Sequence, residues 1–284
     1  MSEGITDMKE QRYTEAKAPL FTVITVCYQA ETVIEDTIRS VLLQDYDDFE
    51  YIIVDGASGD GTCGIIKKYL DDPRIRFISE PDKGLFDAMN KGIRLSRGAY
   101  LNFMNAGDCL ADPHVLTQVS KEIQEHPDVD FIYGDVLYVY EDGTERVRKY
   151  PWYCSTKLYQ LLGDCINHQS MFAKRHNYTD REFDLVTYKI NCYRDWISYQ
   201  CSTKKKFLAM GKVTCRFSFG GTSFTLAHFD EHMKELDLIL KRYYPLGYPL
   251  HVIMRSIRNG KVSSRILHKA YELVFLKKNK ERKS

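Results

Sequence analysis

The sequence lacks several features that mark common classes of protein. No two of its eight cysteines form a Cys-x-x-Cys pair, which argues against a zinc site. It has no run of 18 apolar residues that could span a bilayer, and residues 1–17 are polar, without the apolar core of a secretory signal. Internal repeats and low-complexity segments are also absent. We therefore expect a cytoplasmic protein whose thiols are unpaired.

Charge is balanced overall but unevenly distributed. The 284 residues include 40 Lys and Arg and 39 Asp and Glu. Ten of the basic residues, but only the acids Glu272 and Glu281, lie between Met254 and Ser284. This local excess predicts a basic C-terminal segment that contacts something anionic. Its basic and aromatic residues do not follow an RNA-binding pattern, so we expect no nucleic-acid partner.

Strand and helix patterns alternate from residue 20 onward. Apolar residues at Ile34, Ile38 and Val41 share one helix face, as do those at Leu85, Met89 and Ile93. Before, between and after these helices the sequence predicts strands at 20–27, 51–55, 75–79, 99–104 and 130–139. This alternation indicates an α/β fold, with a mostly parallel sheet flanked by helices.

The regularity of this strand–helix alternation also suggests where the domain begins and ends. We expect a flexible lead at 1–17, one domain at 18–225 and a helical, basic segment at 226–284. Within the domain the alternation is regular from residue 20 and weakens after about Tyr150.

Polar clusters follow the predicted strands at the point where each strand ends. Tyr28 follows the first strand, Asp55 ends the second, Glu80–Gly84 follows the third and Asn105–Asp108 follows the fourth. In an open parallel sheet these ends share one edge, which is where ligands bind. The four clusters together predict an enzyme site.

Each residue type suits a particular chemistry and also has a plainer structural explanation. Asp55 can accept hydrogen bonds from a ring N–H or a sugar hydroxyl, or it can simply hold a turn. Asp108 offers an oxygen ligand to a hard divalent cation, or forms an Asx turn with Gly107. Lys83 precedes a helix and can meet a phosphate, although Pro-Asp-Lys-Gly is also an ordinary turn.

Further along the chain three more polar residues stand out. Asp195 lies beside Trp196, where partial desolvation would suit a general base, although a surface ion pair explains an isolated acid equally well. His168, which precedes Gln169, is more often a structural hydrogen-bonding group than a ligand. Asp87 falls on the helix after Lys83, where a solvated helix face is the alternative.

In chain order these clusters resemble the family 2 glycosyltransferases, which have the Rossmann-like GT-A fold. Val54–Thr62 is similar to that family's V-D-D-G-S-x-D-x-T element. Glu80–Gly92 matches, almost letter for letter, a subgroup that assembles bacterial surface polysaccharides and lipid-linked oligosaccharides. The resemblance is close over 20–135 and looser over 160–223. It implies a nucleotide-sugar half at 18–135 and an acceptor half at 136–225.

The resemblance implies roles for the donor-side residues. Tyr28 and Asp55 would face the nucleotide base, while Lys83 and Asp87 would border the nucleotide-sugar. Asn105 would do the same at the start of the segment that replaces the family's D-x-D motif. Here Asn105 and Gly107 stand where the family has acids, so Asp108 is the remaining carboxylate for Mn²⁺ or Mg²⁺.

The resemblance also implies an acceptor side and a reaction. Asp195 would be the catalytic base, and His168 and Gln169 would lie near the acceptor. The expected reaction is inverting transfer from a UDP-sugar to a hydroxyl of a saccharide or lipid-linked acceptor. For a lipid-linked acceptor, the C-terminal basic segment would bind the anionic inner face of the plasma membrane, making the protein peripheral.

Two other functions stay open from the sequence. A nucleotidyltransferase typically has a Gly-rich basic loop after its first strand, and Cys27–Ala30 contains neither glycine nor lysine. A non-catalytic nucleotide-sugar-binding scaffold would be consistent with the reduced acidic motif at Asn105–Asp108.

Overall fold

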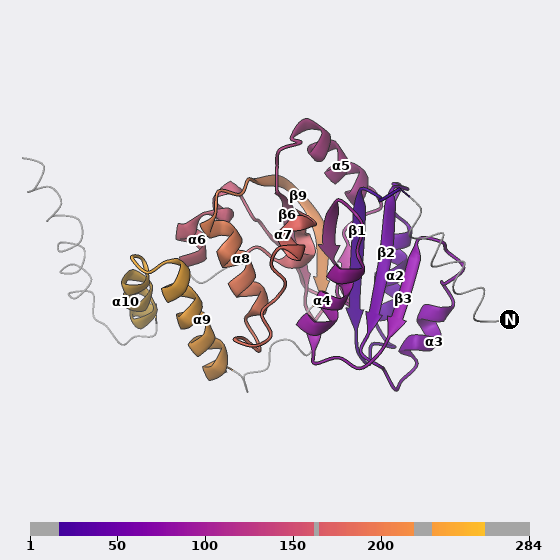
Figure 1. Ribbon diagram of the computed structural model, residues 1–284, viewed down its shortest axis with the longest axis horizontal. Helices are drawn as coiled ribbons and strands as arrows, with labels where there is room; N and C mark the ends of the chain where they lie inside the picture. The colour runs from indigo at the N-terminus through magenta and orange to yellow at the C-terminus, as the bar shows by residue number, and fades with distance from the viewer. Residues whose placement is uncertain (1–16, 162–164, 219–228, 259–284) are drawn as a thin grey trace, which may run out of the picture.

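The computed structural model describes residues 17–161, 165–218 and 229–258. They form one sheet with helices packed on it, so the expected α/β architecture is confirmed (Figure 1). The strands are β1 (Phe21–Cys27), β2 (Phe49–Asp55), β3 (Ile75–Ser79), β4 (Tyr100–Phe103), β5 (Cys109–Leu110), β6 (Phe131–Val139), β7 (Glu145–Arg148), β8 (Met171–Lys174) and β9 (Phe207–Ser218). The helices are α2 (Ile34–Leu42), α3 (Thr62–Lys67), α4 (Leu85–Leu95), α5 (Val115–Glu125), α6 (Lys157–Leu161), α7 (His176–Thr179), α8 (Cys192–Ser202), α9 (Phe229–Tyr243) and α10 (Tyr248–Arg258).

The strand order is β3-β2-β1-β4-β8-β6-β9-β5, with β7 paired to β6. The first four strands are parallel, as predicted. Beyond β4 the sheet is mixed because β8 runs antiparallel to both β4 and β6. After β1 the chain adds β2 and then β3 on one side of that strand. It then crosses over and adds β4 on the other side of β1. This reversal places a topological switch point at the carboxyl ends of β1 and β4.

The two central strands are buried along their whole length. All seven residues of β1 and all seven of β2 are buried. Strands covered on both faces read as nearly continuous apolar runs, which is the pattern of these two segments. Helix α4 packs against both strands, and a methyl group on its Gly92 would overlap the Ile24 side chain. Glycine is therefore needed at this helix–sheet contact.

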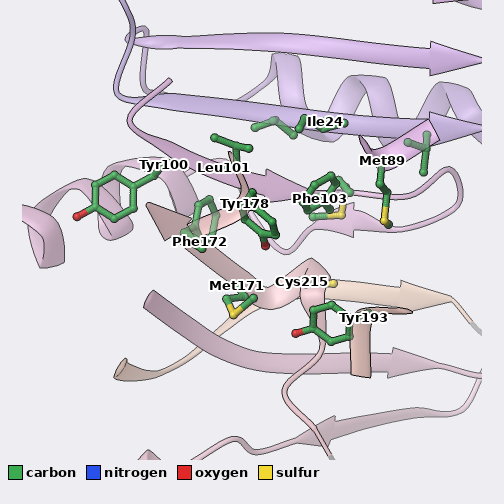
Figure 2. Close-up of a cluster of buried hydrophobic side chains, with 14 of the residues drawn as sticks. Ile24, Met89, Tyr100, Leu101, Phe103, Met171, Phe172, Tyr178, Tyr193 and Cys215 are labelled. Carbon is green, nitrogen blue, oxygen red and sulfur yellow. The ribbon is translucent and has the colours of Figure 1, made fainter. Parts of the chain in front are cut away.

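Aromatic side chains fix α8 to the sheet. Phe103 of β4 meets Tyr178 edge-on at 5.2 Å, and Tyr178 stacks on Trp196 of α8 at 4.2 Å (Figure 2 shows the first pair). All three rings are buried, and each such side chain contributes about 1.5–3 kcal/mol of burial free energy. The position of α8 is thus set by the same core that holds β4.

Helices α8, α9 and α10 lie together at the end of the molecule away from β3 (Figure 1). Leu236, Leu240 and Tyr244 form a small apolar cluster with Leu161 of α6. The buried Glu235 carboxylate accepts backbone N–H bonds from residues 189–191, just before α8. The predicted helix at the start of the 226–284 segment therefore packs on α6 and on the residues that precede α8.

Parts of three predictions fall outside the described residues. These are residues 1–16 of the lead, residues 219–225 of the domain and residues 259–284 of the basic segment, which include most of its Lys and Arg. Among the helices that the structure does describe, none has the length and apolarity needed to cross a membrane.

Candidate active site

Four of the predicted residues come together at the switch point. Gln169 Nε2 donates a 2.7 Å hydrogen bond to Asp108 Oδ2, and Asn105 Nδ2 lies 3.1 Å from His168 Nε2. The sequence placed Asn105 and Asp108 on the donor side, at the nucleotide-sugar and the metal, and placed His168 and Gln169 on the acceptor side. The structure joins them into one polar cluster at the end of β4.

Sheet pairing explains this meeting. Since β8 runs antiparallel to β4, the residues just before β8 lie beside those just after β4. Asn102 of β4 fixes the contact by donating to the carbonyl oxygens of Gln169 and Met171, at 3.0 Å each. The turn after β4 needs Gly107, whose φ of +95° is costly for residues with a side chain.

Burial controls the charge of this cluster. Asp108 is only 5% exposed, and burial raises its pKa to about 7 despite donors from Gln169 and the Ser218 backbone. Burial also lowers the pKa of His168 to about 4, so its imidazole is neutral at pH 7. The His168 ring contacts Tyr193 of α8 edge-on at 5.1 Å. Tyr193 is therefore part of this cluster, although its sequence context gave no signal for it.

The cluster contains oxygen atoms of the kind that bind a divalent cation. Asn105 Oδ1 and Gln169 Oε1 are buried and have no hydrogen-bond partner in the structure. Asp108 adds a carboxylate, and amide and carboxylate oxygens are ligands that hard cations such as Mn²⁺ and Mg²⁺ prefer. Unsatisfied buried oxygens are costly, and a bound cation would remove that cost. The residues present thus fit the predicted metal.

A different group meets a purely geometric test for metal ligands. In the described part of the chain, Glu122, Glu125 and His126 form the only group of three His, Cys, Asp or Glu whose ligand atoms approach one another closely. It lies at the end of α5, where Glu125 and His126 are exposed, and exposed acids often gather without a metal. The switch-point cluster differs because two amide oxygens supplement its one carboxylate.

The residues predicted to face the nucleotide base differ sharply in exposure. Tyr28 is 62% exposed, whereas Asp55 is completely buried. The Asp55 carboxylate accepts bonds from Ser58, Ser79 and Cys63. Burial by itself would raise the pKa of Asp55, but these donors outweigh it, so the pKa lies below its ordinary value. Asp55 is therefore a charged group that holds the loop after β2.

Lys83 and Asp87 lie at the start of α4, as the sequence predicted. Asp87 Oδ2 accepts a 3.0 Å bond from the Lys83 backbone, and the Lys83 side chain is exposed. Further along the same helix, Lys91 Nζ forms a 2.9 Å ion pair with Glu80 Oε1. These contacts fix the turn before α4 and leave the Lys83 ammonium accessible to an anion.

Asp195 does not join the switch-point cluster in this structure. Its Oδ2 lies 2.6 Å from Arg181 Nη2, and its Oδ1 accepts a 3.0 Å bond from the Tyr243 hydroxyl of α9. The carboxylate is 1% exposed. Residues two apart on a helix point to different sides, so Asp195 faces α9 while Tyr193 faces His168. The sequence could not reveal which of these two sides faces the site.

With this geometry in hand, comparison with known proteins identifies the family. The model of glycosyl transferase family 2 matches residues 22–185. The chain belongs to this family. It is accordingly an enzyme, a glycosyltransferase, and the resemblance found in the sequence is confirmed.

Individual relatives support the same assignment. A "PGL/p-HBAD biosynthesis glycosyltransferase" of Mycobacterium bovis is 29% identical over 257 residues, covering 84% of this chain and 96% of the relative. The putative teichuronic acid biosynthesis glycosyltransferase TuaG of Bacillus subtilis is 41% identical over 92 residues, covering 32% of this chain and 36% of TuaG.

Solved structures confirm the GT-A fold. S. aureus TarS 1–349 in complex with UDP-GlcNAc has a TM-score of 0.63 at 16% identity, over 79% of this chain and 67% of that one. The mannosyltransferase PcManGT from Pyrobaculum calidifontis, in complex with GDP-Man and Mn²⁺, has a TM-score of 0.57 at 15% identity. That match covers 95% of this chain and 87% of PcManGT.

Proposed function

We propose that this glycosyltransferase moves a sugar from a UDP-sugar to a hydroxyl of a saccharide or lipid-linked acceptor, with inversion at the anomeric carbon, in the synthesis of a cell-surface glycan. The observation that carries the proposal is the convergence of Asn105, Asp108, His168 and Gln169 at the switch point. Relatives named for glycan biosynthesis, and fold neighbours solved with nucleotide-sugars, are consistent with it.

In this reaction the acceptor oxygen bonds to the anomeric carbon as the bond from that carbon to the diphosphate breaks. The acceptor hydroxyl loses its proton to a base, and the nucleoside diphosphate leaves. Asp108, with the amide oxygens of Asn105 and Gln169, would hold Mn²⁺ or Mg²⁺. The cation would supply positive charge to the leaving diphosphate. Neutral His168 keeps the Asn105 amide in place without adding charge.

Two roles for Asp195 are compatible with transfer, and its contacts favour one of them. A base must come within hydrogen-bond reach of the acceptor hydroxyl. Here Arg181 and Tyr243 hold both carboxylate oxygens, so a base role requires these bonds to open when the acceptor binds. The contacts suit a residue that positions α8. The base role implied by the resemblance stays a prediction, which the Asp195 variants in the Discussion test.

For a lipid-linked acceptor we propose attachment to an anionic membrane surface through the C-terminal helices. On α10 the exposed side chains of Leu250 and Met254 are four residues apart and share one face. Leu246, just before the helix, is 98% exposed. Each Lys or Arg near an anionic surface adds about 1 kcal/mol of attraction, and the following sequence is rich in both. Removing residues 259–284 should lower binding to anionic vesicles and leave neutral vesicles unaffected.

A donor screen tests the function directly. Purified protein is incubated with a panel of nucleotide-sugars, with and without Mn²⁺ and candidate acceptors, and nucleoside diphosphate release is measured. Release that needs both cation and acceptor supports transfer. Binding without turnover on any acceptor would instead support the scaffold alternative. Release of pyrophosphate from nucleoside triphosphates would support nucleotidyl transfer.

A further inference from the structure

The carboxylate that was expected to face the nucleotide base, that of Asp55, is already engaged within the protein. Both oxygens of Asp55 already accept bonds from within the protein, to Oδ1 from Ser58 Oγ and to Oδ2 from the Ser58 backbone, Ser79 and Cys63. The side chain has no exposed surface. A base arriving at this edge of the sheet would meet other groups first.

Asp82, which is partly exposed, lies at the same edge. Its Oδ1 is fixed by a 2.8 Å bond from the Gly84 backbone, and no donor in the described part of the chain contacts its Oδ2. This Oδ2 lies beside Gly56, since a methyl group on Gly56 would be 2.6 Å from it. The same methyl position is 3.3 Å from ring carbon Cδ2 of Tyr28. A free carboxylate oxygen and an exposed aromatic ring thus flank the bare backbone of Gly56.

This arrangement has the two parts that recognition of a base requires. An aromatic ring offers a stacking surface to any base. A carboxylate oxygen accepts a hydrogen bond but donates none, so it favours a base whose pairing edge carries a ring N–H. Uracil presents such an N–H at N3, whereas cytosine presents a lone pair at the same position. Gly56 leaves room for this because it places no side chain between the two groups.

We propose that Asp82 determines the base specificity of the donor by accepting the ring N–H of uracil while the base lies against Tyr28. This inference rests on the proposed function, since it assumes a nucleoside diphosphate-sugar donor. It assigns to Asp82 the role that the sequence suggested for Asp55, and leaves Asp55 to hold the loop after β2.

The test measures dissociation constants of UDP, CDP and 3-methyl-UDP by calorimetry in the presence of Mn²⁺. Wild type should bind UDP more tightly than CDP or 3-methyl-UDP by roughly 10-fold or more, because the latter two lack the N–H. Asp82→Asn, which can both donate and accept, should weaken UDP, strengthen CDP and bring the two within a few-fold of each other. An unchanged UDP preference in this variant would overturn the proposal.

Two glycine variants provide a second test that keeps the charge of Asp82. Gly56→Ala should displace the carboxylate oxygen and reduce the preference for UDP in the same direction. Gly59→Ala is the matched control in the same loop, since a methyl group there has no atom within 4 Å. If both alanine variants keep the wild-type preference, Asp82 does not read the base.

The outcomes separate this inference from the function beneath it. If wild type binds none of the three nucleotides, the nucleotide-sugar function fails and the inference fails with it. If wild type prefers UDP and the Asp82 and Gly56 variants do so equally, the function stands and only the role of Asp82 is overturned.

Discussion

Gln169 Nε2 donates a 2.7 Å hydrogen bond to Asp108 Oδ2, joining two elements that are 61 residues apart in the chain. One oxygen of the Asp108 carboxylate is thereby oriented, while Gln169 Oε1 stays buried without a partner. Groups that orient a metal ligand commonly matter nearly as much as the ligand itself. The Asp108–Gln169 pair is therefore the structural centre of the proposed cation site.

Replacing Gln169 should weaken the response to cation. In Gln169→Leu, Asp108 loses its side-chain donor and the site loses an amide oxygen. We expect the Mn²⁺ concentration for half-maximal activity to rise roughly 10- to 100-fold. Gln124→Leu, on the exposed surface of α5, serves as the control and should not change it. A normal Mn²⁺ response in Gln169→Leu would remove this residue from the cation site.

Asp195 and Arg181 should behave as a coupled pair. Asp195→Asn and Arg181→Met each leave one partner of a largely buried ion pair unpaired, which should lower the free energy of unfolding by about 3 kcal/mol. The double variant should lose clearly less than the sum, which chemical denaturation of all four proteins would show.

The same variants separate a positioning role from a base role. A positioning role predicts similar losses of turnover in both single variants, with an unchanged shape of the pH–rate profile. If Asp195→Asn abolishes turnover and the basal pH limb while Arg181→Met remains active, Asp195 is the base and its bonds to Arg181 and Tyr243 open during catalysis.

His168 should make the protein less stable in acid. Its pKa is about 4 when folded and about 6.5 when unfolded, so the unfolded chain binds the proton more readily between these values. The stabilisation is fully present above pH 6.5 and is lost as the pH falls toward 4, by at most roughly 3 kcal/mol. Comparing unfolding of wild type and His168→Gln from pH 7 to pH 4 isolates this effect. Parallel curves would contradict the lowered pKa of His168 in the folded protein.

Glu235 should link α9 to the start of α8. Its carboxylate accepts bonds from the backbone N–H groups of residues 189–191 and from Asn191 Nδ2. Glu235→Ala leaves several buried donors unsatisfied and should cost about 2–4 kcal/mol of stability. Lys234→Ala, on the exposed side of the same helix, should cost little. Equal effects of the two variants would mean that α9 is not integral to the domain.

The sequence revealed the parts of the site that depend on local pattern. Alternating apolar segments predicted β1 to β4 closely, and the strand-end rule then placed Tyr28, Asp55 and Asn105–Asp108 at one edge. His168 and Gln169 were recognised by resemblance, but their contact with Asn105 and Asp108 depends on β8 pairing antiparallel with β4. No periodicity in the sequence specifies that pairing.

The remaining differences come from tertiary packing. Asp55 ends a strand and Asp82 follows one, and only the folded loops show that Asp55 is enclosed by donors while Asp82 lies beside Gly56. Tyr193 and Asp195 are two residues apart, and the contacts of α8 with α9 decide which one faces the site. The contacts of Tyr193 and Asp195 join residues 27 and 48 positions apart in the chain and leave no local signature.

The most direct measurement of the central claim is acceptor-dependent release of UDP from UDP-sugars by wild type, Asp108→Asn and Asp112→Asn. Asp112 is an exposed acid four residues further on, outside the cluster, and provides a matched control. The account predicts Mn²⁺-dependent release by wild type and by Asp112→Asn, and a loss of at least roughly 100-fold in Asp108→Asn. Release by Asp108→Asn at the rate of Asp112→Asn would contradict it.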